Sequence, residues 1–121
     1  MEMLIVTRDA DRWSVFANAL TQAGHTVSFA PNAHDAVIAA QTRTLSLVLW
    51  DAIDTDATLR DDSVRIMMVD VRIHQCAATT RTHEEFHHLT EGLGFLPEVS
   101  SGLSAADALK LLNSLRAVEG M

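Results

Sequence analysis

The sequence contains little of what several classes of protein require. Its one cysteine, Cys76, cannot form a disulfide within the chain, which favours a reducing, cytoplasmic environment. Its densest apolar runs, 47–50 and 66–69, are far shorter than the roughly 18 residues of a membrane span. No basic patch followed by a long apolar stretch begins the chain, so we expect neither a secretion signal nor a membrane partner.

Basic residues are also scarce. Eight arginines and one lysine, Lys110, stand against 16 acidic residues, and the formal net charge is −7. A protein that binds nucleic acid normally neutralises phosphates with a basic face, and the arginines here are scattered. We therefore expect no nucleic-acid partner.

What the chain does contain is enough apolar material for a core. Hydrophobic residues make up 48% of the 121 positions, and two prolines and five glycines are too few for a disordered segment. The length fits a single domain over residues 1–121.

The apolar pattern alternates between two kinds of segment. Short apolar runs predict buried strands, whereas apolar residues at helical spacing predict helices between them. Asp9 is expected to cap the first helix and Gly24 to end it, while Ser104 is expected to cap the last. The polar segment 52–63 leaves room only for a shortened third helix. The expected strands are 3–7, 25–29, 45–51, 64–71 and 94–97, and the other expected helices cover 31–42 and 82–91.

This alternation predicts an α/β fold. Consecutive strands joined by right-handed helical crossovers form a parallel sheet with helices on both faces. We expect a flavodoxin-like, three-layer sandwich of five strands in the order 2-1-3-4-5. In such sheets, ligands gather at the carboxyl ends of the strands.

Three acidic residues follow predicted strand ends. Asp9 comes after the first strand, Asp51 ends the third, and Asp70 lies near the end of the fourth. Together they could hold a divalent cation such as Mg²⁺ through oxygen ligands. The alternative, which we favour, is that they are solvated loop acids and helix caps, so we expect no metal and no cofactor.

The same segments resemble the receiver domain of two-component response regulators. The resemblance lies in LIVTRD, in AGHTVSFAPNAHDAV and in LVLWD, and the order of elements agrees over essentially the whole chain. It implies that Asp51 occupies the place of the phosphoacceptor aspartate, which attacks a phosphoryl donor while Mg²⁺ neutralises the developing charge.

The resemblance also shows what this chain lacks. Thr7 and Arg8 stand where receivers have a metal-binding acidic pair, and Asp9 comes one place later. With the strands assigned as above, Asp70 takes the place of the switch serine or threonine. Glu98 falls near the place of the invariant lysine.

These exchanges place negative groups where a phosphoryl group needs positive ones. Asp54, in place of the usual methionine of the following turn, adds another acid. We expect Arg8 to compensate in part by pairing with Asp51. The sequence is therefore interpreted as a degenerate receiver, or pseudo-receiver, whose phosphorylation-dependent switching is lost.

A second motif, His83-Glu84-x-x-His87, matches the H-E-x-x-H signature of zinc peptidases. Such an enzyme needs a third ligand, and Glu91 and Glu98 are the only nearby carboxylates. The segment lies in a predicted helix of a small domain without a substrate cleft. We therefore interpret it as an ordinary helix.

If the phosphoacceptor pocket is inert, function lies on a surface. We expect a stand-alone signalling module, not an enzyme, that acts by contact with a protein partner or with itself as a homodimer. Two alternatives stay open: a metal-dependent site, either hydrolytic on the histidine helix or built from Asp9, Asp51 and Asp70, and a conventional receiver phosphorylated on Asp51. The expected interaction face contains His83, His87, Phe95, Leu103 and Lys110.

Overall fold

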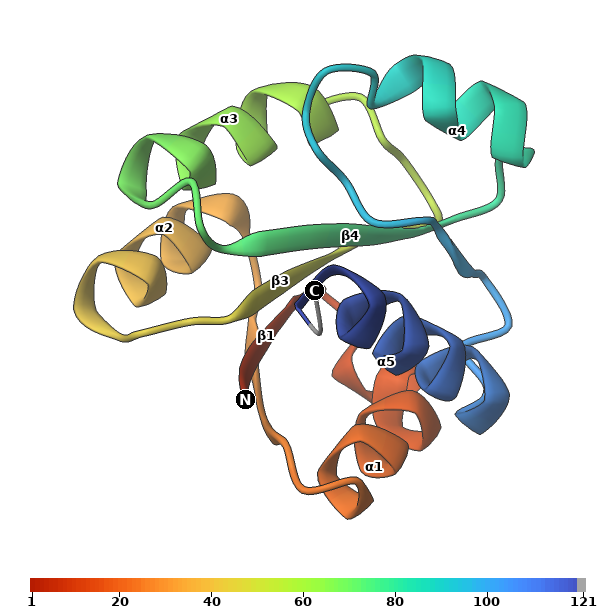
Figure 1. Ribbon diagram of the computed structural model, residues 1–121. Helices are drawn as coiled ribbons and strands as arrows, with labels where there is room; N and C mark the ends of the chain where they lie inside the picture. The colour runs from red at the N-terminus through yellow and green to blue at the C-terminus, as the bar shows by residue number, and fades with distance from the viewer. Residues whose placement is uncertain (120–121) are drawn as a thin grey trace.

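Five parallel strands form the central layer of the computed structural model, which describes residues 1–119 (Figure 1). Their order, β2-β1-β3-β4-β5, confirms the predicted flavodoxin-like topology. The two edges of the sheet are therefore β2 and β5. The strands are β1 (Glu2–Val6), β2 (Thr26–Ala30), β3 (Leu47–Ala52), β4 (His74–Thr79) and β5 (Val99–Ser100).

Helices cover both faces of this sheet (Figure 1). A short 3-10 helix, η1 (Ala10–Trp13), leads into α1 (Ser14–Gln22), which lies beside α5 (Ala105–Glu119) on one face. The other face carries α2 (Ala33–Thr42), α3 (Leu59–Val69) and α4 (His83–Leu89). No helix within the described residues is both long and apolar enough to cross a bilayer.

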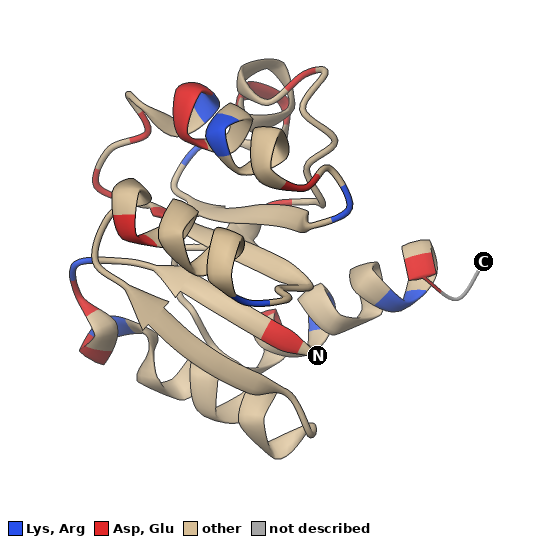
Figure 2. Cartoon of the chain, turned by 90° about the vertical axis from the view of Figure 1, so that its left-hand side faces the viewer, with Lys and Arg blue, Asp and Glu red and all other residues tan. Residues whose placement is uncertain are grey.

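Successive residues of each central strand enter two separate cores. In β1, Met3 and Ile5 pack with the cluster under α1 and α5, whereas Leu4 packs with the cluster under α2, α3 and α4. This alternation follows from the two-residue period of a strand, and burial on both faces accounts for the continuous apolar run. Charged residues lie mainly on helices and loops and leave the sheet largely uncharged (Figure 2).

Two predicted elements between Asp51 and His83 are wrong. Residues 64–71, expected to form the fourth strand, lie mostly in α3, which is an 11-residue helix and not a shortened one. Its buried side chains are Leu59, Ser63 and Ile66, a helical spacing. The true fourth strand, HQCAAT, did not look like a strand because it contains polar residues that are nevertheless buried.

Buried polar residues stabilise this region through internal hydrogen bonds. The indole of Trp50 donates to Gln75 Oε1 at 2.8 Å, and the Gln75 amide donates to the Ser63 carbonyl at 3.0 Å. Gln75 is only 3% exposed, so these bonds replace the water contacts that it loses on folding. They explain how a glutamine occupies a core strand.

The last strand also differs from its prediction. Residues 94–97 are not in a strand, although the Leu96 backbone N–H donates to the Gln75 carbonyl of β4 at 3.0 Å, and the β4–β5 ladder pairs Val99 and Ser100 with Ala78 and Thr79. Pro97 cannot donate a backbone hydrogen bond, which disfavours regular pairing at 94–97. Glu98 therefore precedes the last strand instead of following it.

Candidate functional site

Asp51 lies at the carboxyl end of β3, in the middle of the sheet. Its neighbours across the sheet are Ala78 of β4 and, on the other side, the residues where β1 ends and Thr7 begins the loop to η1. The side chain of Asp51 is only 7% exposed. Its carboxylate is thus partly shielded from solvent at the carboxyl ends of the strands, where ligands of such sheets usually bind.

Three side chains donate hydrogen bonds to the same oxygen of this carboxylate. Asp51 Oδ2 accepts from Thr7 Oγ1 at 2.7 Å, from Arg12 NH2 at 2.9 Å and from Trp13 Nε1 at 3.0 Å. The other oxygen, Oδ1, accepts the backbone N–H of Ile53 at 3.2 Å. Both oxygens therefore have partners within the protein, and Oδ2 is saturated.

The cation beside Asp51 is Arg12, so the prediction that Arg8 fills this role is wrong. Arg8 is exposed, whereas the Arg12 guanidinium bridges Asp51 and Asp54, with 3.0 Å between NH2 and Asp54 Oδ2. The guanidinium of Arg12, instead of that of Arg8, is therefore the counterion of the Asp51 carboxylate.

The 3-10 helix η1 brings Arg12 and Trp13 to this place. As predicted, Asp9 caps the chain at this point, and its Oδ1 accepts the Arg12 backbone N–H at 3.2 Å. The Asp9 backbone N–H in turn donates to Thr7 Oγ1 at 3.0 Å. The tight turn starts α1 four residues later than a helix beginning at Ala10 would, and Trp13 becomes fully buried with its indole N–H beside Asp51.

These contacts change the acidity of the groups involved. Burial by itself would raise the pKa of Asp51, but the hydrogen bonds from Trp13, Thr7 and Arg12 outweigh it and hold this pKa below its ordinary value. Hydrogen bonds to Asp54 and Asp51 raise the pKa of Arg12. Asp51 and Arg12 therefore form a carboxylate–guanidinium ion pair at physiological pH.

Two acids that were predicted to surround Asp51 lie elsewhere. Asp70 ends α3 and accepts hydrogen bonds from Arg72. It comes just before the amino end of β4, whereas Asp51 lies at the carboxyl ends of the strands. Glu98 precedes β5 and contacts the imidazole of His83 at 2.9 Å. Of the three acids predicted to add negative charge around Asp51, Asp54 lies beside it, joined through the Arg12 guanidinium, whereas Asp70 and Glu98 do not.

The end of β4 instead carries a threonine. Thr79 pairs in register with Ala52, the residue after Asp51, and its hydroxyl accepts the Arg81 backbone N–H at 3.1 Å. A hydroxyl residue thus occupies the strand-four position that the resemblance assigns to the switch residue. Sequence reasoning missed it because the strand was placed ten residues too early.

An ion pair joins the β3–α3 loop to the β4–α4 loop. Arg81, just after β4, donates from Nε and NH2 to the two oxygens of Asp56, in the loop between β3 and α3. Because Asp56 belongs to the β3–α3 loop and Arg81 to the β4–α4 loop, the pair holds these two loops together at the end of the sheet where Asp51 lies. The same bond lowers the pKa of Asp56.

The residues proposed for the interaction face divide into two groups. His83 and Lys110 are exposed and line one groove, and the imidazole of His87 stacks on that of His83 with 6.4 Å between ring centroids. Leu103, however, is 2% exposed and belongs to the core. Phe95 is half-buried and packs against Phe86. Leu103 is therefore not available to a partner, which corrects that part of the prediction, whereas the partly exposed Phe95 stays a candidate.

Metal ligands are not assembled in the described part of the chain. No group of three histidine, cysteine or acidic side chains among residues 1–119 is placed to hold an ion. The particular set Asp9, Asp51 and Asp70 is divided between opposite ends of the sheet, which removes it as a candidate.

Comparison with known proteins connects this geometry to one fold. No protein-family model and no curated protein matches the sequence. Among solved structures, a response regulator from Thermotoga maritima superposes with a TM-score of 0.82 at 15% identity, covering 96% of this chain and 97% of that one. The chemotaxis response regulator CheY4 of Vibrio cholerae gives 0.77 at 19% identity, with 93% and 95% covered.

A response regulator from Desulfuromonas acetoxidans gives a TM-score of 0.76 at 18% identity, with 98% of this chain and 96% of that one covered. These identities are low, so the likeness concerns the fold. The chain has the fold of a response-regulator receiver domain, and Asp51 stands at the end of the third strand of that fold.

Proposed function

We propose that this chain is a receiver-fold signalling module that acts through protein contacts, without phosphorylation-dependent switching. The observation that carries the proposal is the saturation of Asp51 Oδ2 by Thr7, Arg12 and Trp13. In this arrangement the carboxylate behaves as a structural anion that holds η1 against the sheet.

A nucleophilic carboxylate needs an oxygen lone pair that can reach a phosphorus atom. Here attack by Oδ2 disrupts hydrogen bonds from side chains, one of them from the fully buried Trp13, and hydrogen bonds to charged groups contribute about 1.5–3 kcal/mol each. Attack by Oδ1, which accepts only the Ile53 backbone N–H, keeps those bonds but leaves the Arg12 guanidinium on the oxygen that would face a divalent cation. The guanidinium of Arg12 also repels the divalent cation that phosphoryl transfer uses.

The stabilisation of a phosphorylated product is also incomplete. A phosphoryl group adds roughly −1.5 to −2 charge and requires nearby cations. The only lysine of the chain, Lys110, lies in α5, well after the end of β5. Ser101 follows β5 directly, and it brings a hydroxyl without charge.

One observation favours a second candidate, a conventional phosphorylated receiver. Thr79 supplies a hydroxyl at the end of β4, in the strand adjacent to Asp51. If the Arg12 guanidinium kept only its contact with Asp54, the Asp51 carboxylate would lose its counterion. The carboxylate and the Thr79 hydroxyl would then both be present at the carboxyl ends of β3 and β4. Phosphorylation of Asp51 would then be chemically reasonable.

Incubation with acetyl phosphate and Mg²⁺ separates the two candidates. The intact mass of the wild-type chain and of an Asp51→Asn variant would be measured over a time course. We expect no adduct on either. Stoichiometric addition of one phosphoryl group to the wild type, absent from Asp51→Asn, would establish the conventional receiver and refute the phosphorylation-independent one. An Arg12→Ala chain treated in parallel reports whether the arginine is what prevents the reaction.

A further inference from the structure

Three large apolar side chains are exposed along α3 and the turn that follows it. Val64 is 44% exposed, Met68 82% and Val71 76%. Val64 and Met68 lie one helical turn apart on the same side of α3, and Val71 comes two residues after its end. Single exposed apolar residues are ordinary, but several in one place indicate a surface that another molecule covers.

A hollow of about 330 Å³ lies next to these side chains. Met67 and Val71 line it from the side of α3, and residues 92–94 line it from the loop after α4. The same surface therefore presents a protruding side chain, Met68, beside a concave site. A surface that pairs with its own copy needs both shapes, because each copy supplies what the other receives.

The charges around this surface are balanced, although the chain as a whole is acidic. Between positions 60 and 72, three arginines are matched by three aspartates, whereas the formal net charge of the chain is −7. Two copies that meet here thus avoid the repulsion that the net charge would otherwise impose. The charged residues are Arg60, Asp61, Asp62, Arg65, Asp70 and Arg72.

The order of these charges favours an antiparallel pair of helices. Asp61 lies in the first turn of α3, and Arg72 follows the end of the helix with its side chain 87% exposed. Positions 61 and 72 are nearly equally far from Met67. In two antiparallel helices related by a two-fold axis near Met67, Asp61 of each copy therefore lies level with Arg72 of the other. A parallel pair would instead bring the two Asp61 carboxylates together.

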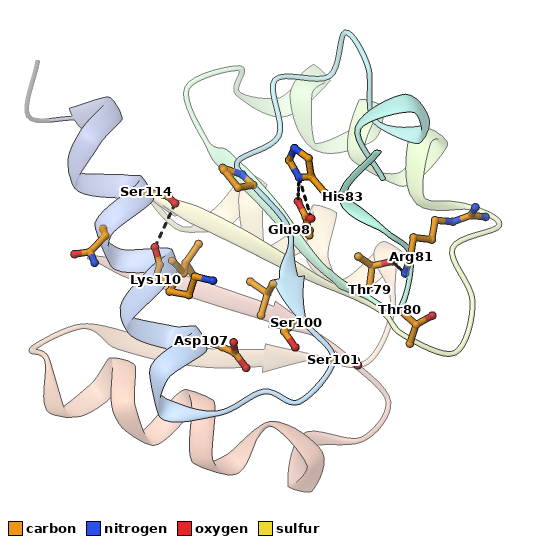
Figure 3. Close-up of a pocket in the computed structure, with 14 residues that line it drawn as sticks. Thr79, Thr80, Arg81, His83, Glu98, Ser100, Ser101, Asp107, Lys110 and Ser114 are labelled. Carbon is orange, nitrogen blue, oxygen red and sulfur yellow. Dashed lines mark hydrogen bonds and ion pairs between the residues drawn. The ribbon is translucent and has the colours of Figure 1, made fainter. Parts of the chain in front are cut away.

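The groove between α4, β5 and α5 differs from this surface in its chemistry (Figure 3). Polar and charged side chains, among them Glu98, Asp107 and Lys110, line much of that groove. The α3 surface instead has an apolar centre, formed by Val64 and Met68, with charged residues around it. An apolar centre within a polar rim is the usual arrangement of a protein–protein interface.

We propose that two copies of this chain form a dimer through α3, with the helices antiparallel about a two-fold axis near Met67. Val64 and Met68 of each copy are then buried against the other. Methionine suits the centre of such an interface, because its flexible and polarisable side chain adapts to an irregular surface. The dimer goes beyond the proposed function and does not involve Asp51, which lies at the carboxyl end of β3.

Sedimentation velocity of the full chain at increasing concentration tests this inference. We expect a monomer–dimer equilibrium with a dissociation constant of about 10–100 µM, because one helix from each copy forms a small interface. Met68→Glu places a charge at the centre and should weaken the dimer about tenfold or more. Leu109→Glu, the same change at a 55% exposed site of α5, should leave it unchanged. Both sites are exposed, so both chains are expected to fold, which circular dichroism verifies.

An exchange of charges tests the antiparallel arrangement. Asp61→Arg and Arg72→Glu each set like charges against one another across the two-fold axis, and each should weaken the dimer about threefold or more. The double variant restores opposite charges and should recover the wild-type dissociation constant to within about twofold. Weakening by the double variant that equals the product of the two single effects would refute the arrangement.

Two further results would overturn the inference. A monomer at every concentration would leave this surface to a different molecule, and a dimer that Leu109→Glu abolishes while Met68→Glu does not would place the interface on α5. None of these readouts involves phosphorylation. Labelling of Asp51 by acetyl phosphate would therefore refute the proposed function and leave the dimer intact, whereas a monomeric chain would refute the dimer alone.

Discussion

Arg12 and Asp51 are 39 positions apart in the sequence, yet 2.9 Å separates Arg12 NH2 from Asp51 Oδ2. The contact joins the first turn after β1 to the end of β3 at the position where receiver folds place their phosphoacceptor. It gives the carboxylate an internal counterion. The stability and the chemistry of this edge of the sheet therefore depend on one arginine.

Removal of that arginine should destabilise the fold. Arg12→Met leaves the Asp51 carboxylate, whose side chain is 7% exposed, without its cation, and we expect the free energy of unfolding to fall by about 1–3 kcal/mol. Urea denaturation followed by tryptophan fluorescence measures this change. The control is Arg43→Met, which breaks an exposed pair with Glu2 and should cost less than about 1 kcal/mol. Equal losses in the two variants would contradict a special role for Arg12.

The contribution of Asp51 should depend on pH. Its pKa in the folded chain lies below the unfolded value of about 4, so the carboxylate stabilises the fold above pH 4 and loses this effect as the pH falls through the folded pKa. We expect the difference in unfolding free energy between the wild type and Asp51→Asn to be constant between pH 5 and 7 and to shrink below about pH 4. Each unit by which folding lowers the pKa of Asp51 contributes about 1.4 kcal/mol to this difference. A difference that grows on acidification would have the wrong sign.

Gln75 should be essential to the core although it is polar. Gln75→Leu fills the same space but leaves the Trp50 N–H and the Ser63 carbonyl without their partner. We expect a loss of about 1–3 kcal/mol, because buried polar groups without partners are costly. Gln41→Leu, at an exposed position of α2, is the matched control and should change the unfolding midpoint little. A Gln75→Leu chain as stable as the wild type would show that these bonds contribute nothing net.

The pair between Arg81 and Asp56 should restrain the loop that precedes α4. Asp56→Asn removes the charge of the acceptor, and amides in residues 80–85 should then exchange faster with deuterium, because local opening becomes easier. Asp61→Asn removes an equal charge from an exposed site on α3. Mass-spectrometric exchange that is identical in both variants would exclude a clamp at this position.

The strand order could be predicted from the sequence because burial on both faces leaves a strong signal. Leu47, Val48 and Leu49 are all fully buried, so β3 reads as an uninterrupted apolar run followed by Asp51. The same reasoning failed at 64–71. There Ile66 is buried while Met68 is 82% exposed, which is incompatible with a strand that places both residues on one face. Apolar composition alone does not separate the two structures.

The site was predicted in part. The place of Asp51 follows from the end of an apolar run, but its partners depend on the 3-10 turn of η1, which leaves no periodic signal in four residues. Arg8 is nearer to the end of β1 in sequence, and yet the turn brings Arg12 to the carboxylate. The place of Thr79 could not be predicted for a related reason. Gln75 and the alanines of β4 give this buried strand no run of large apolar residues.

The indole N–H of Trp13 offers the most direct measurement, because it donates to Asp51 Oδ2 at 3.0 Å and reports any change at that oxygen. The chain has two tryptophans, and a Trp50→Phe variant assigns the two indole signals in a ¹H–¹⁵N spectrum. On titration with Mg²⁺ and beryllofluoride, a mimic of the phosphoryl group, we predict that the Trp13 signal keeps its position. A saturable shift of that signal, lost in Asp51→Asn, would contradict the account.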